Sequence, residues 1–407
     1  MKRIVPFIVF GIVAAILIVS CGAVGVSLAN RTFVPESAPE NAGTEFVGVV
    51  DSAAQLNASY YDEIKNMKDL QDLVSVWGSS NNDAKMHLNT VSTYLIVVRE
   101  AGTVTTNYGN ADVISLVSVN TDAKKVSVLA LDPDSLVYID LADTKLTAES
   151  PVYAKLNTAY ANGGITLLEK TVENNFKIEV DHYLVTDMDG VAAVADALGG
   201  VSVMLNEEIK EMITDDFNVI LPANNTPLKG QQIVAFLREK RDGTDSRLAR
   251  QADSLVSVIR SIQQLGFGEA FDLVKELAAV ATTDLKGVEL VNVLRRTILG
   301  AWNDYNVVAY TAPDEGSAVQ YKDSAWIRII DIPMVAQSVQ DKMFNKTNIT
   351  LNDSRLSAVE LIKAVNKLHF DELEKQNAPV VDESDTENTT GEETENTEEP
   401  EDVGSVG

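Results

Sequence analysis

The chain has 407 residues, a net charge of −27 at pH 7 and 45% hydrophobic residues. This length can build one large domain or two smaller ones, and the negative charge argues against nucleic acid as a partner. Cys21 is the single cysteine, so disulfide bonds within the chain are excluded.

The first 30 residues have the pattern of a membrane anchor. Lys2 and Arg3 precede a run over residues 4–30 that has no charged residue and is mostly apolar. A helix that spans the bilayer needs about 20 apolar residues, whereas a cleavable signal has an apolar region of about 7–15 residues. We therefore expect a single-pass helix in the cell membrane, with the N-terminus in the cytoplasm and the rest extracellular. The residues before Cys21 also resemble a lipoprotein cleavage box, so a lipid on Cys21 is the alternative anchor.

Residues 31–85 are expected to form an extracellular linker and a helical stalk. Proline and glycine near the start favour a linker, and residues 45–77 have the apolar spacing of a helix. The main domain is expected over residues 86–345. It opens with three β-branched apolar runs, which predict strands covered on both faces, at 92–98, 113–119 and 125–131.

Helical and extended patterns alternate through the rest of this domain. A polar turn at 120–124 predicts a hairpin. Further strands are predicted at 182–186, 201–205 and 305–310. Helices are predicted at 165–175, 188–198, 230–241, 246–265, 269–280, 286–300 and 332–344. This alternation predicts an α/β fold with a mixed, largely covered β-sheet and helices on both faces.

The C-terminal part differs in composition from the main domain. Residues 346–378 are expected to form a helical extension, and residues 379–407 an acidic disordered tail. Eleven acidic residues and no basic residue occur over 382–402. Such a segment cannot bury enough apolar surface to fold.

Residues 238–251 hold five cationic side chains in an acidic protein. Guanidinium groups bind phosphate oxygens in a bidentate manner, so the cluster indicates an anion site. The alternative is a solvated basic helix face with acidic partners.

Two carboxylates are candidates for a metal site. Glu100 ends one predicted strand and Asp112 begins the next. If these strands are neighbours, the carboxylates lie close together, and paired carboxylates with phosphate oxygens are a common Mg²⁺ ligand set. The alternative is two solvated acids at strand ends. The three histidines are widely separated and no nucleophile elbow is present, which argues against a Ser–His–Asp hydrolase.

A series of segments in chain order carries a family resemblance: 111–119, 126–134, 155–164, 182–190, 194–203, 228–238 and 247–251. The series resembles the LytR–CpsA–Psr family of the bacterial cell envelope over about residues 88–345. The resemblance implies a phosphotransferase of cell wall biogenesis. Such enzymes move a glycopolymer from a polyprenyl-pyrophosphate lipid to peptidoglycan, with Mg²⁺ bound to the pyrophosphate.

The resemblance also implies roles for individual residues. Glu100 and Asp112 are expected to bind the metal. The expected catalytic residues are Asp134, as general base, and Arg238. Phosphate-binding roles fall to Arg238, Lys240, Arg247 and Gln251, with Arg99 or Arg241 as the substitute cation for the missing arginines.

The chain departs from the family pattern at three phosphate-binding arginines. Gly102, Asn110 and Pro133 stand where those arginines are expected. Each lost charged hydrogen bond removes roughly 1.5–3 kcal/mol. Two functions therefore stay open: a divergent phosphotransferase, or a degenerate, non-catalytic member. The second would bind polyprenyl lipid or glycopolymer, or serve as a scaffold for envelope assembly.

Overall fold

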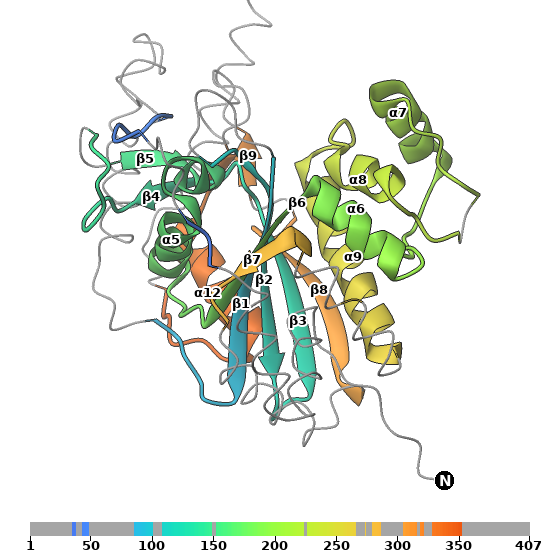
Figure 1. Cartoon of the computed structure of the whole chain (residues 1–407). Helices are drawn as coiled ribbons and strands as arrows, with labels where there is room; N and C mark the ends of the chain where they lie inside the picture. Colours follow the sequence, from blue (N-terminus) through green and yellow to red (C-terminus); the bar gives the residue numbers. More distant parts are fainter. Residues whose placement is uncertain are drawn as a thin grey trace, which may run out of the picture. The chain divides into compact units, whose positions relative to one another are not determined.

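The computed structural model describes residues 35–37, 43–48, 85–100, 108–148, 152–223, 226–265, 273, 279–285, 304–315, 318–320 and 328–351. Within them, a six-stranded mixed sheet has the order β7-β6-β1-β2-β3-β8, with helices on both of its faces (Figure 1). The predicted mixed α/β fold is therefore confirmed.

The element bounds follow in chain order. The strands are β1 Val91–Arg99, β2 Ala111–Asn120, β3 Lys125–Leu131, β4 Leu136–Ile139, β5 Val152–Lys155, β6 His182–Asp187, β7 Ala281–Thr283, β8 Asn306–Ala312, β9 Ala318–Gln320 and β10 Arg328–Ile330. The helices are α5 Leu156–Phe176, α6 Met188–Ala197, α7 Glu207–Phe217, α8 Gln231–Arg238, α9 Thr244–Gln264 and α12 Ile332–Phe344.

The pairing of the central strands places several loops at one end of the sheet. β2 is antiparallel to both β1 and β3, whereas β1 is parallel to β6 and β3 is parallel to β8. The predicted hairpin is confirmed, with Asn120 of β2 opposite Lys125 of β3. Because β2 runs against its two neighbours, β1 and β3 end where β2 begins. The acidic residues at these three strand ends therefore lie on the same end of the sheet.

The side chains of the strands alternate between two apolar clusters, one on each face of the sheet. Leu95 and Val97 of β1 belong to the cluster that includes α5 and α12. Tyr94 and Ile96 belong to the cluster that includes α9. The alternation is that of a β-strand, whose successive side chains point to opposite faces. Both faces are buried, as the continuous apolar runs predict.

A third apolar cluster joins α6, α7 and α8 (Figure 1). The helix α7 was not predicted from the sequence. Its N-terminus is capped by Asn206, whose side chain accepts a hydrogen bond from the backbone N of Ile209 at 2.8 Å. Acidic residues in its first turn add a favourable interaction with the helix dipole.

The strand predicted over residues 201–205 is wrong. In the part of the chain that the structure describes, this stretch makes one β-bridge, between Val201 and Leu228. Met204 is 93% exposed. The stretch does not join the sheet and leads directly into α7.

The helix α5 starts well before its predicted beginning at residue 165. Its two halves meet at Gly164, which has φ 64° and ψ −158°. A Cβ atom at this position would lie 2.5 Å from Cε1 of Tyr108. Glycine is therefore required here both by the backbone conformation and by the close approach of an aromatic ring.

We expect Gly164→Ala to lower the free energy of unfolding by about 1–3 kcal/mol, because it combines backbone strain with crowding. Gly199→Ala is the matched control, since Gly199 has φ 78° and a Cβ atom added there would meet nothing within 4 Å. Thermal unfolding of both variants measures the difference. Equal losses in the two variants would contradict the role assigned to Tyr108.

Two short stretches, one of the predicted linker and one of the predicted helical stalk, pack on the domain. The helix predicted from residue 45 is wrong for residues 45–48, which are not helical. Phe46 is 4% exposed and lies in the apolar cluster on the α5 face. The backbone N of Val47 donates to Oδ1 of Asn162 at 2.7 Å, and Nδ2 of Asn162 donates to the carbonyl of Val47 at 2.9 Å. Glu36 accepts a hydrogen bond from the backbone N of Ile165 at 2.7 Å. The packed domain thus includes residues that precede its predicted start.

Other predictions fall outside the described residues. These are the membrane helix over residues 1–30, most of the stalk, most of both helices over 269–300, most of the extension over 346–378 and the acidic tail. Among the described helices, none is both long and apolar enough to cross a membrane.

Candidate functional site

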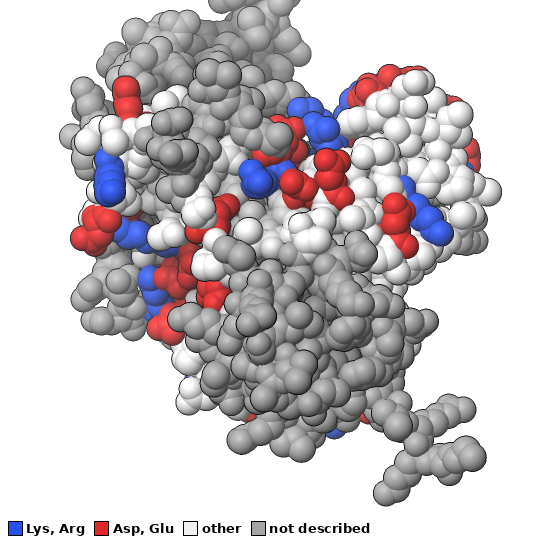
Figure 2. All heavy atoms as spheres, in the orientation of Figure 1, with Lys and Arg blue, Asp and Glu red and all other residues white. Residues whose placement is uncertain are grey.

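A pocket of about 360 Å³ lies where β1 and β3 end and β2 begins, and α8 and α9 form its other wall. Of the predicted site residues, all except Arg99 line it. The lining residues are Glu100, Asn110, Ala111, Asp112, Pro133, Asp134, Lys155, Asn157, Phe217, Leu237, Arg238, Lys240, Thr244, Arg247 and Gln251. Figure 2 shows basic and acidic side chains interspersed beside the lobe that carries α6, α7 and α8.

Two of the acids form a close pair at the strand ends. The backbone N of Glu100 donates to the carbonyl of Asn110 at 2.8 Å, which holds the end of β1 beside the start of β2. Burial and then the neighbouring Glu100 carboxylate raise the pKa of Asp112 to about 6, against the opposing effect of nearby arginines. The predicted proximity of the two carboxylates is therefore present in the structure.

Arg238, the last residue of α8, lies against this acidic pair. Its Nη2 donates to Oε1 of Glu100 at 2.7 Å, and its Nε lies 3.8 Å from Oδ2 of Asp112. The side chain is 41% exposed. Arg238 therefore both offsets the negative charge of the pair and keeps an accessible surface in the pocket.

A second charged group joins α9 to the turn after β3. Nη2 of Arg247 lies 3.6 Å from Oδ2 of Asp134, and Nζ of Lys155 lies 3.0 Å from Oδ1 of the same carboxylate. Among the described residues, the buried Nε of Arg247 has no hydrogen-bond partner. Arg247 thus lines the pocket while its Nε stays buried beneath the pocket surface.

Lys155 was not among the predicted site residues. It ends β5 immediately before α5, and it belongs to the polar segment 155–164 of the family series. From the sequence, that segment has the pattern of an ordinary capped helical turn. The pairing of β4 with β5 brings Lys155 to the pocket wall, and local sequence could not reveal this pairing.

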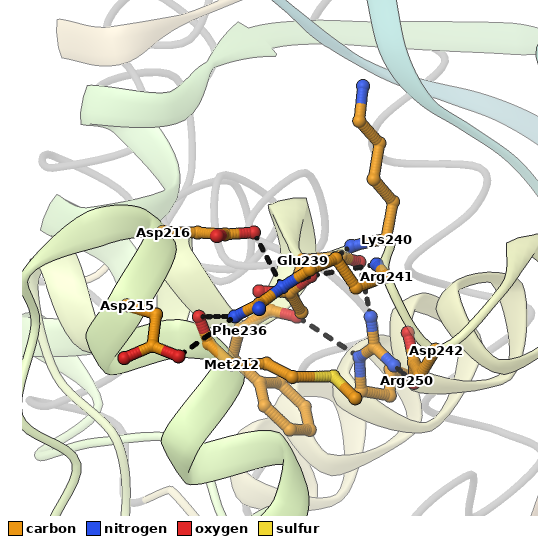
Figure 3. Close-up of polar contacts among 9 residues, drawn as sticks. All are labelled: Met212, Asp215, Asp216, Phe236, Glu239, Lys240, Arg241, Asp242 and Arg250. Carbon is orange, nitrogen blue, oxygen red and sulfur yellow. Dashed lines mark hydrogen bonds and ion pairs between the residues drawn. The ribbon is translucent and has the colours of Figure 1, made fainter.

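The cationic cluster 238–251 divides into two parts. Figure 3 shows Arg241 and Arg250, which do not line the pocket, together with Lys240, which does. Nη2 of Arg241 donates to the carbonyl of Met212 at 2.5 Å, and its Nε lies 2.9 Å from Asp216. Arg250 donates through Nε to the carbonyl of Phe236 at 3.2 Å and also contacts Asp242. The guanidinium groups of Arg241 and Arg250 are therefore engaged in contacts within the domain.

A buried acid, Glu239, orders the turn between α8 and α9. Oε1 of Glu239 accepts hydrogen bonds from the backbone N atoms of Lys240 and Arg241, both at 2.8 Å. The side chain of Lys240 points away from this network in Figure 3. The solvated-face interpretation therefore fits Arg241, whereas Arg238, Lys240 and Arg247 line the pocket.

Arg99 is the predicted phosphate ligand that the pocket does not include. It is adjacent to Glu100, and successive strand residues point to opposite faces of a sheet. Its charge acts on Tyr160, where it opposes the rise in pKa caused mainly by burial. Tyr160 belongs to the cluster on the α5 face. Arg99 thus does not substitute for a missing arginine in this pocket.

Two of the departures from the family pattern are visible in the pocket wall. Asn110 and Pro133 line it, and neither supplies a cation. Gly102 lies outside the described residues. Lys155 also lines the pocket, where its Nζ is paired with Asp134.

An apolar cavity of about 130 Å³ adjoins the charged pocket. The two share Leu237 and Gln251. The apolar walls come from β1, β2, β6, α6, α8 and α9, and include Ile96, Val113, Leu184, Val194, Ile233 and Val258. A charged pocket and an apolar cavity therefore lie next to each other and share these two residues as part of their walls.

The fold and site define an α/β domain with a charged pocket at one end of its sheet. The LytR_cpsA_psr family model matches residues 98–322, which is more than half of the chain. The chain therefore belongs to the LytR–CpsA–Psr family.

The sequence is similar to those of several cell-envelope proteins. It is 27% identical over 219 residues to Biofilm regulatory protein A of Streptococcus mutans, covering 52% of this chain and 53% of that protein. It is 25% identical over 226 residues to the polyisoprenyl-teichoic acid–peptidoglycan teichoic acid transferase TagU of Enterococcus faecalis, covering 54% and 68%. The matched region thus spans about half the length of the first relative.

Solved structures share the fold. A Streptococcus agalactiae protein matches with a TM-score of 0.55 and 20% identity, covering 69% of this chain and 98% of that chain. A structure described as TagT bound to LIIa-WTA matches with a TM-score of 0.50 and 19% identity, covering 64% and 95%. At this level of identity, these matches support the fold alone.

Proposed function

We propose that this chain transfers a glycopolymer from a polyprenyl-pyrophosphate lipid to peptidoglycan. The observation that carries the proposal is a charged pocket beside an apolar cavity, with Leu237 and Gln251 lining both. A polyprenyl pyrophosphate has the same division into a charged head and an apolar chain. Membership of the family and the transferase names of its relatives support this class of reaction.

The basic side chains of the pocket are placed to bind the pyrophosphate. Arg238 and Arg247 approach from α8 and α9, Lys240 from the turn between these helices and Lys155 from the opposite wall. Guanidinium and ammonium groups form strong charge-assisted hydrogen bonds with phosphate oxygens. Gln251 lines both the pocket and the adjoining cavity, where the head group would meet the prenyl chain.

The proposed reaction is a displacement at phosphorus. A hydroxyl of peptidoglycan attacks the phosphorus that carries the glycopolymer, and the bond to the bridging oxygen breaks. Polyprenyl monophosphate leaves, and the hydroxyl proton passes to Asp134 as the candidate base. Arg238 and Arg247 stabilise the negative charge that develops, which is the main contribution of a protein to phosphoryl transfer.

We propose Mg²⁺ as the cofactor, held by Glu100 and Asp112. The donor set fits, because the pKa of Asp112 is raised to about 6 by burial and by the Glu100 carboxylate, and a cation would relieve the repulsion between the two acids. Among the described residues, no group of three or more metal-ligating side chains occurs. Phosphate oxygens and water would complete the coordination, as is usual for Mg²⁺. When bound, the ion would neutralise charge on the pyrophosphate.

We also propose that residues 1–30 anchor the chain in the cell membrane with the domain outside. The proposal rests on the apolar run in the sequence and on the location of a polyprenyl lipid in a bilayer. Mass spectrometry of the mature N-terminus distinguishes a membrane helix from a lipid on Cys21.

The test of the proposed function is a transfer assay. The purified full-length chain in mild detergent is incubated with Mg²⁺, peptidoglycan and a radiolabelled glycopolymer on polyprenyl pyrophosphate. We expect label on the peptidoglycan together with an equal amount of polyprenyl monophosphate. Lipid binding without either product would favour the non-catalytic alternative, to which the uncharged Asn110 and Pro133 in the pocket wall point.

A further inference from the structure

Arg328 of β10 is a buried arginine outside the pocket and outside the residues that the family model matches. It is 6% exposed. Its Nη1 lies 3.0 Å from Oδ2 of Asp132, and its Nη2 donates to Oδ1 of Asp245 at 2.7 Å. The side chain therefore links the turn after β3 to the first turn of α9.

Both of these elements form the pocket. Pro133 and Asp134 of the turn line it, as do Thr244 and Arg247 of α9. The backbone N of Arg328 also donates to the carbonyl of Asp134 at 2.9 Å. Arg328 thus contacts the elements that carry the phosphate-facing groups without lining the pocket itself.

The contact with Asp132 has an electrostatic consequence for Arg247. The side chain of Asp132 is fully buried. The charged groups that act on it are Arg328, Asp134 and Arg247, and of the two arginines Arg328 has the larger effect. Burial raises the pKa of Asp132 to about 6, and the adjacent Arg328 opposes that rise by stabilising the carboxylate. If Arg328 were absent, Arg247 would be the remaining cation acting on Asp132.

We propose that Arg328 is a positioning residue for the pyrophosphate pocket. By its contacts with Asp132 and with the turn at Asp134, it keeps the guanidinium of Arg247 free to face the bound phosphate. This inference rests on the proposed function, because it takes the pocket to be a pyrophosphate site.

The test is calorimetric titration of the full-length chain in detergent with inorganic pyrophosphate and Mg²⁺. Arg328→Met should weaken binding about tenfold or more, the loss expected when one charge-assisted contact is removed. The double variant Arg328→Met with Asp132→Asn should bind within about threefold of the unchanged chain, since no buried charge then competes for Arg247. Arg328→Lys, which keeps a cation beside Asp132, should also retain binding.

Asp245→Asn distinguishes this role from a purely mechanical one. It removes the other ionic contact of Arg328 but leaves Asp132 neutralised, so binding should be unchanged. The inference is overturned if Arg328→Met binds pyrophosphate normally, if the double variant binds as weakly as Arg328→Met, or if Asp245→Asn binds as weakly. Where Arg328→Met has a lowered melting temperature, the lysine and double variants decide between the two roles. Absence of pyrophosphate binding by the unchanged chain would overturn the proposed function along with this inference.

Discussion

Replacement of Arg247 by alanine is expected to lower the rate of glycopolymer transfer by about 100-fold or more, the size of effect seen when a donor to developing charge is removed. Arg247 faces the pocket from α9, and its buried Nε has no hydrogen-bond partner within the described residues. The initial rate of polyprenyl monophosphate release measures the effect. The melting temperature should change little, because Asp134 keeps Lys155 at 3.0 Å as its partner.

Arg241→Ala is the matched control for this variant. Arg241 belongs to the same cationic cluster, but its guanidinium contacts Met212 and Asp216 and does not line the pocket. We expect its transfer rate to stay within about threefold of the unchanged chain, a difference well below that for a lost charge contact. A normal transfer rate in Arg247→Ala, with a large fall in melting temperature, would instead assign Arg247 a structural role.

Asp112→Asn is expected to remove most of the transfer activity and its dependence on Mg²⁺. The substitution deletes one of the two carboxylates proposed to bind the ion, and a loss of about 100-fold or more is expected when charge stabilisation at phosphorus fails. Titration of the rate with Mg²⁺ measures the change. Full activity with an unaltered Mg²⁺ dependence would contradict the proposed metal site.

The same substitution should stabilise the fold when no divalent metal is present. The pKa of Asp112 is raised from 3.8 to about 6 in the folded chain, so the folded state binds more protons than the unfolded state between these values. Stability therefore falls as the pH rises through this window. Asparagine carries no such penalty, so the variant should gain roughly 1–3 kcal/mol at about pH 8 and nothing at about pH 3. Thermal unfolding of both proteins across this pH range measures the difference. Equal stabilities of the variant and the unchanged chain at every pH would contradict the raised pKa of Asp112.

The central sheet and most of its helices were predictable because their apolar periodicity is strong. The runs that form β1, β2 and β3 predict covered strands. The turn at 120–124 correctly predicts the hairpin of β2 and β3. The helix α7 was missed because its acidic, weakly apolar sequence depends on the cap at Asn206. The alternation at 201–205 predicts a strand that lacks a partner beyond the bridge at Val201.

The candidate site was predictable where residues follow or precede strong strands. Glu100, Asp112 and Asp134 lie at three strand ends that the sheet topology brings to one place. Lys155 could not be found in this way, because the pairing of β4 with β5 positions it. Arg99, which was expected to bind phosphate, does not line the pocket, because sequence proximity to Glu100 does not specify the face of the strand.

The most direct test of the proposed pyrophosphate pocket is a crystal structure of the chain with a polyprenyl pyrophosphate and Mg²⁺. We expect phosphate oxygens within hydrogen-bond distance of Arg238 and Arg247, and the ion against Glu100 and Asp112. The first prenyl units should enter the apolar cavity past Leu237 and Gln251. A pyrophosphate bound elsewhere, or a prenyl chain that leaves the adjoining cavity unfilled, would contradict the proposal.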